Sequence, residues 1–217
     1  MRERSAEFTA ERILAHGDLA GKRVLEVGCG NGRITKLLAE EAASYEAIEP
    51  DASCVEEAKA NISGVHFSTA SGEAMPFEAD TFDVVIFTLS LHHQESAKAL
   101  TEAERVLAKE GVILVVEPLN DGALERVCQV VRDETREKAL AQAAITQSGL
   151  VVTTTEHFTA IWEFDSPGEV VTWVVKTYGA AHTSELEASI FEIPEVRKGR
   201  DLVTLDDTMM LQVLKRP

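Results

Sequence analysis

The sequence predicts an α/β fold in which a doubly wound, largely parallel sheet carries helices on both faces. Short apolar stretches alternate with helical ones, at residues 23–28, 45–49, 65–69, 83–88 and 112–116. The fourth and fifth are apolar almost throughout, which is typical of parallel strands covered on both faces. Alternating units with short connections favour right-handed crossovers. Three glycines directly after the first stretch predict a tight loop that leads into a helix.

The remaining elements follow from periodicity and from residues that end helices. A short helix is expected over residues 8–15, within an N-terminal helical segment of residues 1–20. Apolar residues at three- and four-residue intervals predict a helix around residues 97–107. A further helix is expected from Leu124 to near Gly149, a suitable C-cap.

After residue 149 the pattern becomes extended. Residues 150–164 are rich in Thr and Val and predict a long strand, and residues 202–214 predict a final strand. Residues 164–201 lie between these two strands, and Asp165-Ser166-Pro167 within them is typical of a helix start. We expect one domain over residues 1–217, with 164–201 as a helical insertion.

Composition excludes several classes of partner. The chain has 217 residues and a formal net charge of −16. Phosphate backbones are bound mainly through clustered Lys and Arg, so no nucleic-acid partner is expected, and no membrane is expected either. The start of the chain lacks the apolar stretch of a signal peptide, which predicts a cytoplasmic protein. Three cysteines without metal-ligand spacing predict no metal site.

The glycine loop has an informative spacing. Gly28, Gly30 and Gly32 read G-x-G-x-G, whereas the dinucleotide fingerprint reads G-x-G-x-x-G. Glu49 ends the second strand, where a carboxylate can accept hydrogen bonds from two ribose hydroxyls. Asp51 stands two residues later and is expected to cap the next helix.

Four further segments accompany this loop in order. They are Tyr45–Glu49, Ala70–Phe77 with Asp80–Ile86, Leu89–His93, and Glu102–Pro118. Together they resemble the class I S-adenosylmethionine-dependent methyltransferases, in particular the small-molecule, type 11-like group. The resemblance implies a Rossmann-like sheet of seven strands with an antiparallel last strand. It also implies S-adenosylmethionine as cofactor, S-adenosylhomocysteine as product, and an insertion over residues 164–201 that covers the substrate site.

The resemblance also implies a set of cofactor-binding residues. They are Glu26, Gly28, Cys29, Gly30, Glu49, Pro50, Ser71, Gly72, Glu73, Thr88 and Leu89. Ser71 departs from the aspartate of the family pattern, so adenine recognition could instead depend on Glu73 or on backbone groups. Glu110 stands where the family usually has proline.

Two histidines follow the fourth strand, at the edge where open α/β sheets bind ligands. His93 and His92 are the candidate general bases, since histidine titrates near neutrality and some acceptors arrive protonated. The alternative is that they only orient the loop. Glu117, His157 and Trp162 are weaker candidates for the wall of the pocket.

The predicted function is methyl transfer to a small-molecule acceptor by in-line displacement. A methyltransferase-like protein that binds cofactor or a partner without catalysis is the main alternative, because residues 71 and 110 depart from the family pattern. A nicotinamide-dependent oxidoreductase is disfavoured by the glycine spacing. The sequence leaves open whether the chain is a monomer or a dimer.

Overall fold

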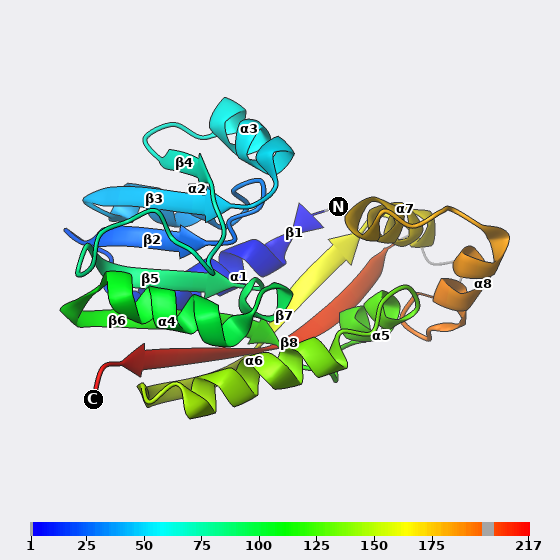
Figure 1. Ribbon diagram of the computed structural model, residues 1–217. Helices are drawn as coiled ribbons and strands as arrows, with labels where there is room; N and C mark the ends of the chain where they lie inside the picture. Colours follow the sequence, from blue (N-terminus) through cyan, green and yellow to red (C-terminus); the bar gives the residue numbers. More distant parts are fainter. Residues whose placement is uncertain (1, 197–201) are drawn as a thin grey trace.

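One sheet organises the molecule. The computed structural model describes residues 2–196 and 202–217. The strand order is β1-β7-β8-β6-β5-β2-β3-β4 (Figure 1). The strands are β1 (Arg2–Glu3), β2 (Arg23–Val27), β3 (Ser44–Glu49), β4 (His66–Thr69), β5 (Phe82–Thr88), β6 (Leu107–Pro118), β7 (Val151–Phe164) and β8 (Val203–Lys215).

Strand direction agrees with the predicted architecture. Strands β2 to β6 pair in parallel, and β8 runs antiparallel to both β6 and β7. The α/β fold with an antiparallel last strand is therefore confirmed. The seven predicted strands are present in the described residues, and the two-residue strand β1 adds an eighth, antiparallel edge beside β7. A pair this short leaves no periodic pattern in the sequence.

Helices cover both faces of the sheet. They are α1 (Arg4–Gly17), α2 (Thr35–Leu38), α3 (Ala52–Asn61), α4 (Ser96–Val106), α5 (Ala123–Gln129), α6 (Thr135–Gln147), α7 (Pro167–Tyr178) and α8 (Ser184–Glu192), with 3-10 turns η1 (Ala39–Glu41) and η2 (Leu91–His93). In Figure 1, α4 and α6 lie in front of the sheet and α1 lies behind it. Within the described ranges, no helix is both long and apolar enough to cross a bilayer.

The central strands alternate their side chains between two cores. On β5, Val84 and Ile86 join the core beneath α1, α2 and α3, whereas Val85 and Phe87 join the core beneath α4 and α6. All four are buried. Successive strand residues point to opposite faces, so an uninterrupted apolar run stabilises both layers at once.

A third core lies at the far end of β7 and β8, where α5, α7 and α8 gather (Figure 1). The predicted helix start is confirmed: the Ser166 hydroxyl accepts a hydrogen bond from the Glu169 amide at 3.2 Å, and Pro167 is in the first turn. Helix α7 ends at Gly179, whose φ of +61° is left-handed. Residues 197–201 of the predicted insertion lie outside the described residues.

The single helix predicted from Leu124 to Gly149 was wrong. Helix α5 ends at Gln129, and α6 begins only at Thr135. Asp133 accepts a hydrogen bond from the Thr135 amide at 3.0 Å, which is the contact of a helix N-terminus. Gly149 ends the second helix region with a φ of +81°, as expected. The break brings Glu134 to a loop beside η2.

Candidate functional site

The glycine loop joins β2 to α2 at the carboxyl edge of the sheet. Gly28, Gly30 and Gly32 all have left-handed backbones, with φ of +77°, +54° and +83°. A Cβ at Gly28 would lie 2.5 Å from Ser90 Cβ, so this position has no room for a side chain. Around Gly30 a Cβ would meet nothing within 4 Å. The loop therefore packs tightly at its start and leaves open space at its middle.

Glu49 holds this loop from the end of β3. Its Oε2 accepts a hydrogen bond from the Gly30 amide at 3.0 Å, and its Oε1 accepts one from the Asp51 amide at 3.0 Å. Asp51 instead caps α3, accepting from the Ser53 amide at 2.8 Å. The two acids thus have different tasks, and the expected cap is confirmed.

A cavity of about 450 Å³, the smaller cavity, opens in front of the loop. Its lining residues are Gly28, Gly30, Glu49, Pro50, Ser71, Gly72, Glu73, Leu89, Ser90, His93 and Gln94. Eight of the predicted cofactor-binding residues are among them. They come from the loops after β2, β3, β4 and β5, whose carboxyl ends share one edge.

Three of the predicted cofactor-binding residues do not line the smaller cavity. Glu26 is buried beneath the glycine loop, where it accepts hydrogen bonds from the Thr35 hydroxyl at 2.6 Å and the Tyr45 hydroxyl at 3.0 Å. Burial raises the pKa of Glu26 to about 7. Cys29 and Thr88 are also buried. Glu26 therefore supports the glycine loop from beneath. Its position in the sequence, two residues before Gly28, does not reveal this role.

Ser71 and Glu73 are part of one turn. The Ser71 hydroxyl accepts a hydrogen bond from the Glu73 amide at 3.2 Å, and Glu73 accepts one from the Glu95 amide at 2.7 Å. Gln94 was not predicted, although it lines the smaller cavity and donates to the Ser90 carbonyl at 3.0 Å. A Cβ at Gly72 would lie 2.2 Å from Gln94 Oε1, so glycine permits this contact.

A second cavity of about 570 Å³, the larger cavity, adjoins the first. It is lined by Asn31, Arg33, Cys54, Glu57, Leu89, His92, His93, Pro118, Leu124, Glu125, Cys128, Glu134, Lys138, Trp162, Trp173, Lys176, Thr177, Tyr178 and Asp207. Leu89 and His93 belong to both cavities. Leu89 has a φ of +54°, an unusual value for a residue with a side chain, and marks the turn at the end of β5.

Aromatic rings form one wall of the larger cavity. The Trp162 and Trp173 rings lie 5.4 Å apart between centroids, and the Arg33 guanidinium carbon lies 5.4 Å from the centre of the Trp162 ring. Tyr178 lines the same cavity from the end of α7. Trp162 was a candidate for this wall. His157 was another, and that prediction was wrong: it is exposed on β7 and lines neither cavity.

Buried charges line the cavity beside the aromatic wall. Lys138 Nζ donates to Glu125 Oε2, and both side chains are less than a tenth exposed. Asp207 on β8 is also buried, and burial raises its pKa to about 7. The lining of the larger cavity is thus part aromatic and part polar.

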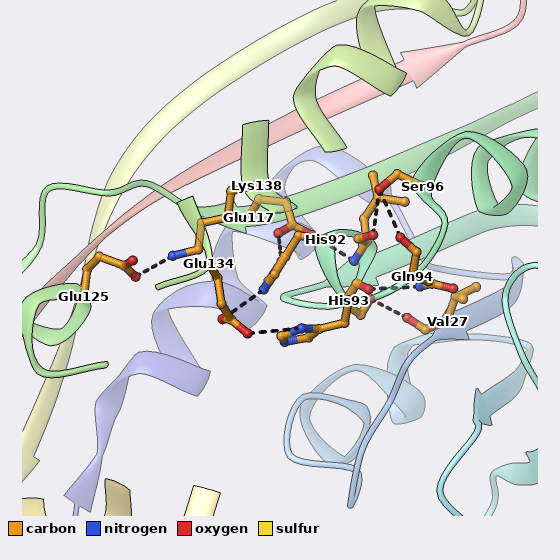
Figure 2. A network of polar contacts seen from close by, with 11 residues as sticks. Val27, His92, His93, Gln94, Ser96, Glu117, Glu125, Glu134 and Lys138 are labelled. Atoms are coloured by element: carbon orange, nitrogen blue, oxygen red, sulfur yellow. Dashed lines mark hydrogen bonds and ion pairs between the residues drawn. The ribbon is translucent and has the colours of Figure 1, made fainter. Parts of the chain in front are cut away.

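The two histidines lie at the centre of a polar network (Figure 2). Glu117 accepts hydrogen bonds from the Leu91 amide at 2.9 Å and from His92 Nδ1. His92 Nε2 lies 3.7 Å from Glu134 Oε2, and His93 Nδ1 lies 3.6 Å from Glu134 Oε1. Glu117, expected in the wall of the pocket, therefore fixes the turn η2 and the first imidazole instead.

The two imidazoles have different environments. The His92 side chain is 3% exposed and that of His93 is 47% exposed. Burial alone would lower the pKa of His92, but the hydrogen bond to Glu117 and the nearby charges of Glu117 and Glu134 raise it to about 9. The pKa of His93 is lowered, by burial and then by the charge of His92. Of the two predicted bases, only His93 faces both cavities.

Residues 25–115 match the family model described as a methyltransferase domain. Phthiotriol/phenolphthiotriol dimycocerosates methyltransferase 1 of Mycobacterium ulcerans is 33% identical over 108 residues, which cover 48% of this chain and 40% of that protein. The ubiquinone/menaquinone biosynthesis C-methyltransferase of Campylobacter jejuni is 27% identical over 103 residues, covering 44% of each. This chain thus spans less than half the length of these curated relatives.

Solved structures extend the likeness to the whole chain, as a likeness of fold. The YcgJ protein of Bacillus subtilis superposes with a TM-score of 0.69 at 20% identity and covers 98% of both chains. A geranyl diphosphate methyltransferase solved with S-adenosylmethionine gives a TM-score of 0.63 at 16% identity, over 97% of this chain and 85% of that one.

Proposed function

We propose that this chain transfers the methyl group of S-adenosylmethionine to a small molecule. The premise is that residues 25–115 form a class I methyltransferase domain. The cofactor occupies the smaller cavity, with its ribose on Glu49 and its methionine part along the glycine loop. S-adenosylhomocysteine leaves as the product. A family match, a methyltransferase fold and a lined cavity at the expected sheet edge support this proposal.

The observation that carries the proposal is the junction of the two cavities at Leu89 and His93. Methyl transfer needs nucleophile, methyl carbon and sulfur in line, at a place closed to water. A cofactor in one cavity and an acceptor in the other would meet at this junction. Positioning then supplies most of the acceleration, because the sulfonium already makes the methyl group electrophilic.

The larger cavity supports a small-molecule acceptor. Its volume of about 570 Å³ lies within the usual range for ligand pockets. The methyltransferases that share this domain are named for phthiotriol lipids and for quinones, which are small molecules with large apolar parts. The aromatic wall suits such an acceptor. We further propose that the predicted insertion, of which residues 164–196 are described, covers this cavity, as α7 contributes Trp173 and Tyr178 to its lining.

Two predictions from the sequence remain predictions. One is the cytoplasmic location and the other is the role of a histidine as general base. The alternative of a non-catalytic cofactor-binding protein is motivated by Ser71, whose hydroxyl is a weaker acceptor for an amino group than a carboxylate.

Calorimetry and a transfer assay test the proposal. Purified protein is titrated with S-adenosylhomocysteine and, separately, with NADH, and only the first is expected to bind. Radiolabelled S-adenosylmethionine is then incubated with a metabolite panel. Binding of NADH without any response to S-adenosylhomocysteine would overturn the proposal. Cofactor binding with no transfer to any lipid, quinone or amine acceptor would favour the non-catalytic alternative.

A further inference from the structure

We infer that His92, His93 and Glu134 form a binding site for a divalent transition metal of the zinc class, at the wall of the larger cavity. One ligand atom from each of these three residues lies within 4.8 Å of the other two. All three residues line the larger cavity. Two imidazoles and one carboxylate are donors that suit zinc, cobalt and iron.

The separations fit metal ligands better than hydrogen bonds. Glu134 Oε2 lies 3.7 Å from His92 Nε2 and Glu134 Oε1 lies 3.6 Å from His93 Nδ1, and both separations are longer than a hydrogen bond. Bonds of about 2.0–2.1 Å to a tetrahedral zinc ion set neighbouring ligand atoms about 3.3–3.4 Å apart. Small side-chain movements would therefore close the three groups around one ion.

Glu117 acts as the partner that a metal-bound histidine usually has. A carboxylate only accepts hydrogen bonds, so Nδ1 of His92 donates to Glu117 and its proton stays there. Nε2, which faces Glu134, is then the ring nitrogen that gives up its proton when a metal binds (Figure 2). A carboxylate behind a ligating imidazole fixes both its tautomer and its orientation.

Burial also agrees with a site that is open on one side. The side chains of His92 and Glu134 are 3% and 8% exposed, whereas that of His93 is 47% exposed. Arg132 Nε lies 3.1 Å from Glu134 Oε1, which leaves Oε2 facing His92. Three protein ligands with a fourth position open to a cavity are typical of catalytic rather than structural zinc. An oxygen of the acceptor would occupy that position, and the ion would favour its ionised form.

Metal titration tests the site without any methyl acceptor. Protein stripped with a chelator is titrated with Zn²⁺ in competition with a chromophoric chelator. We expect one equivalent to bind, with a micromolar or tighter dissociation constant. His93→Ala and Glu134→Gln should each weaken binding at least about tenfold, and Glu117→Gln about 10- to 100-fold. His182→Ala is the matched control, because it removes an exposed histidine 3.6 Å from Glu187, and it should change nothing.

Two further measurements keep the result unambiguous. Unfolding temperatures of the metal-free variants show whether each still folds, and the half-exposed position of His93 makes its variant the safest. Co²⁺ added to the unmodified protein should give the strong visible absorption of four-coordinate cobalt without a thiolate band. A thiolate band would place the ion at Cys54 or Cys128, which both line the same cavity, and would overturn the proposal.

Binding that is absent at millimolar Zn²⁺, or equal in all variants, would also overturn it. His92 would then be a charged link between Glu117 and Glu134 and nothing more. Because metal affinity is measured without cofactor, this failure is distinct from failure of the methyltransferase proposal, which S-adenosylhomocysteine binding decides.

Discussion

Replacing Glu49 with alanine separates cofactor recognition from helix capping. The carboxylate lies at the smaller cavity and accepts from two backbone amides, at 3.0 Å each, which fix its orientation where we propose that the ribose binds. Hydrogen bonds to a charged group contribute about 1.5–3 kcal/mol, so Glu49→Ala should weaken S-adenosylhomocysteine binding about 10- to 150-fold. Calorimetry of the purified variant measures this loss directly.

Asp51→Ala is the matched control, two residues away. Asp51 caps α3 through the Ser53 amide and does not line the smaller cavity. Its loss should cost about 1 kcal/mol of unfolding free energy and leave the affinity unchanged within about twofold. Thermal unfolding should show a decrease of about 2–4 °C for a chain of this size. Equal losses of affinity in both variants would refute the division of roles between these acids.

Two other predictions concern the aromatic wall and the sheet edge. Trp173→Ala should leave S-adenosylhomocysteine affinity intact and slow methyl transfer, because the ring lines the larger cavity and not the smaller one. A loss of about 3–5 kcal/mol in the free energy of unfolding, as expected for a core aromatic residue, would show instead that it is a packing residue. Asp83 accepts three hydrogen bonds from Arg23, which lower the pKa of its carboxyl to about 2. Because this folded-state pKa lies below the unfolded value, the ion pair stabilises the protein above about pH 4 and loses that contribution as the pH falls toward 2. The free energy of unfolding, measured by chemical denaturation across that range, should therefore fall more for the unmodified protein than for Asp83→Asn.

The residues of the smaller cavity, where we propose that the cofactor binds, could be predicted because their meeting depends on chain order. In a parallel sheet every strand ends at the same edge, so residues that follow successive strands meet there. Glu49, Ser71 and Leu89 each follow a different strand and all line the smaller cavity. No knowledge of side-chain packing was needed to bring them together.

The larger cavity depends on contacts between segments that are distant in the sequence, and periodicity does not reveal such contacts. Glu134 was expected inside one long helix, whereas the structure places it in a break between two. The missed signal was Asp133 before Thr135, a local capping pair. The same break lets Lys138 on α6 reach Glu125 on α5, a pair that one straight helix would hold far apart.

The three cores divide the chain into parts that can change separately. The core of α5, α7 and α8 shares no buried residue with the two cores that flank the parallel strands. It is carried on the far ends of β7 and β8, and it forms most of the aromatic wall. Substitutions in this core can reshape the larger cavity while the glycine loop, with Glu26 and Glu49 that hold it, keeps its packing. Under the proposed function, one methyl donor site can in this way serve many acceptors, with the choice encoded mainly after residue 122, in the segments that build this core.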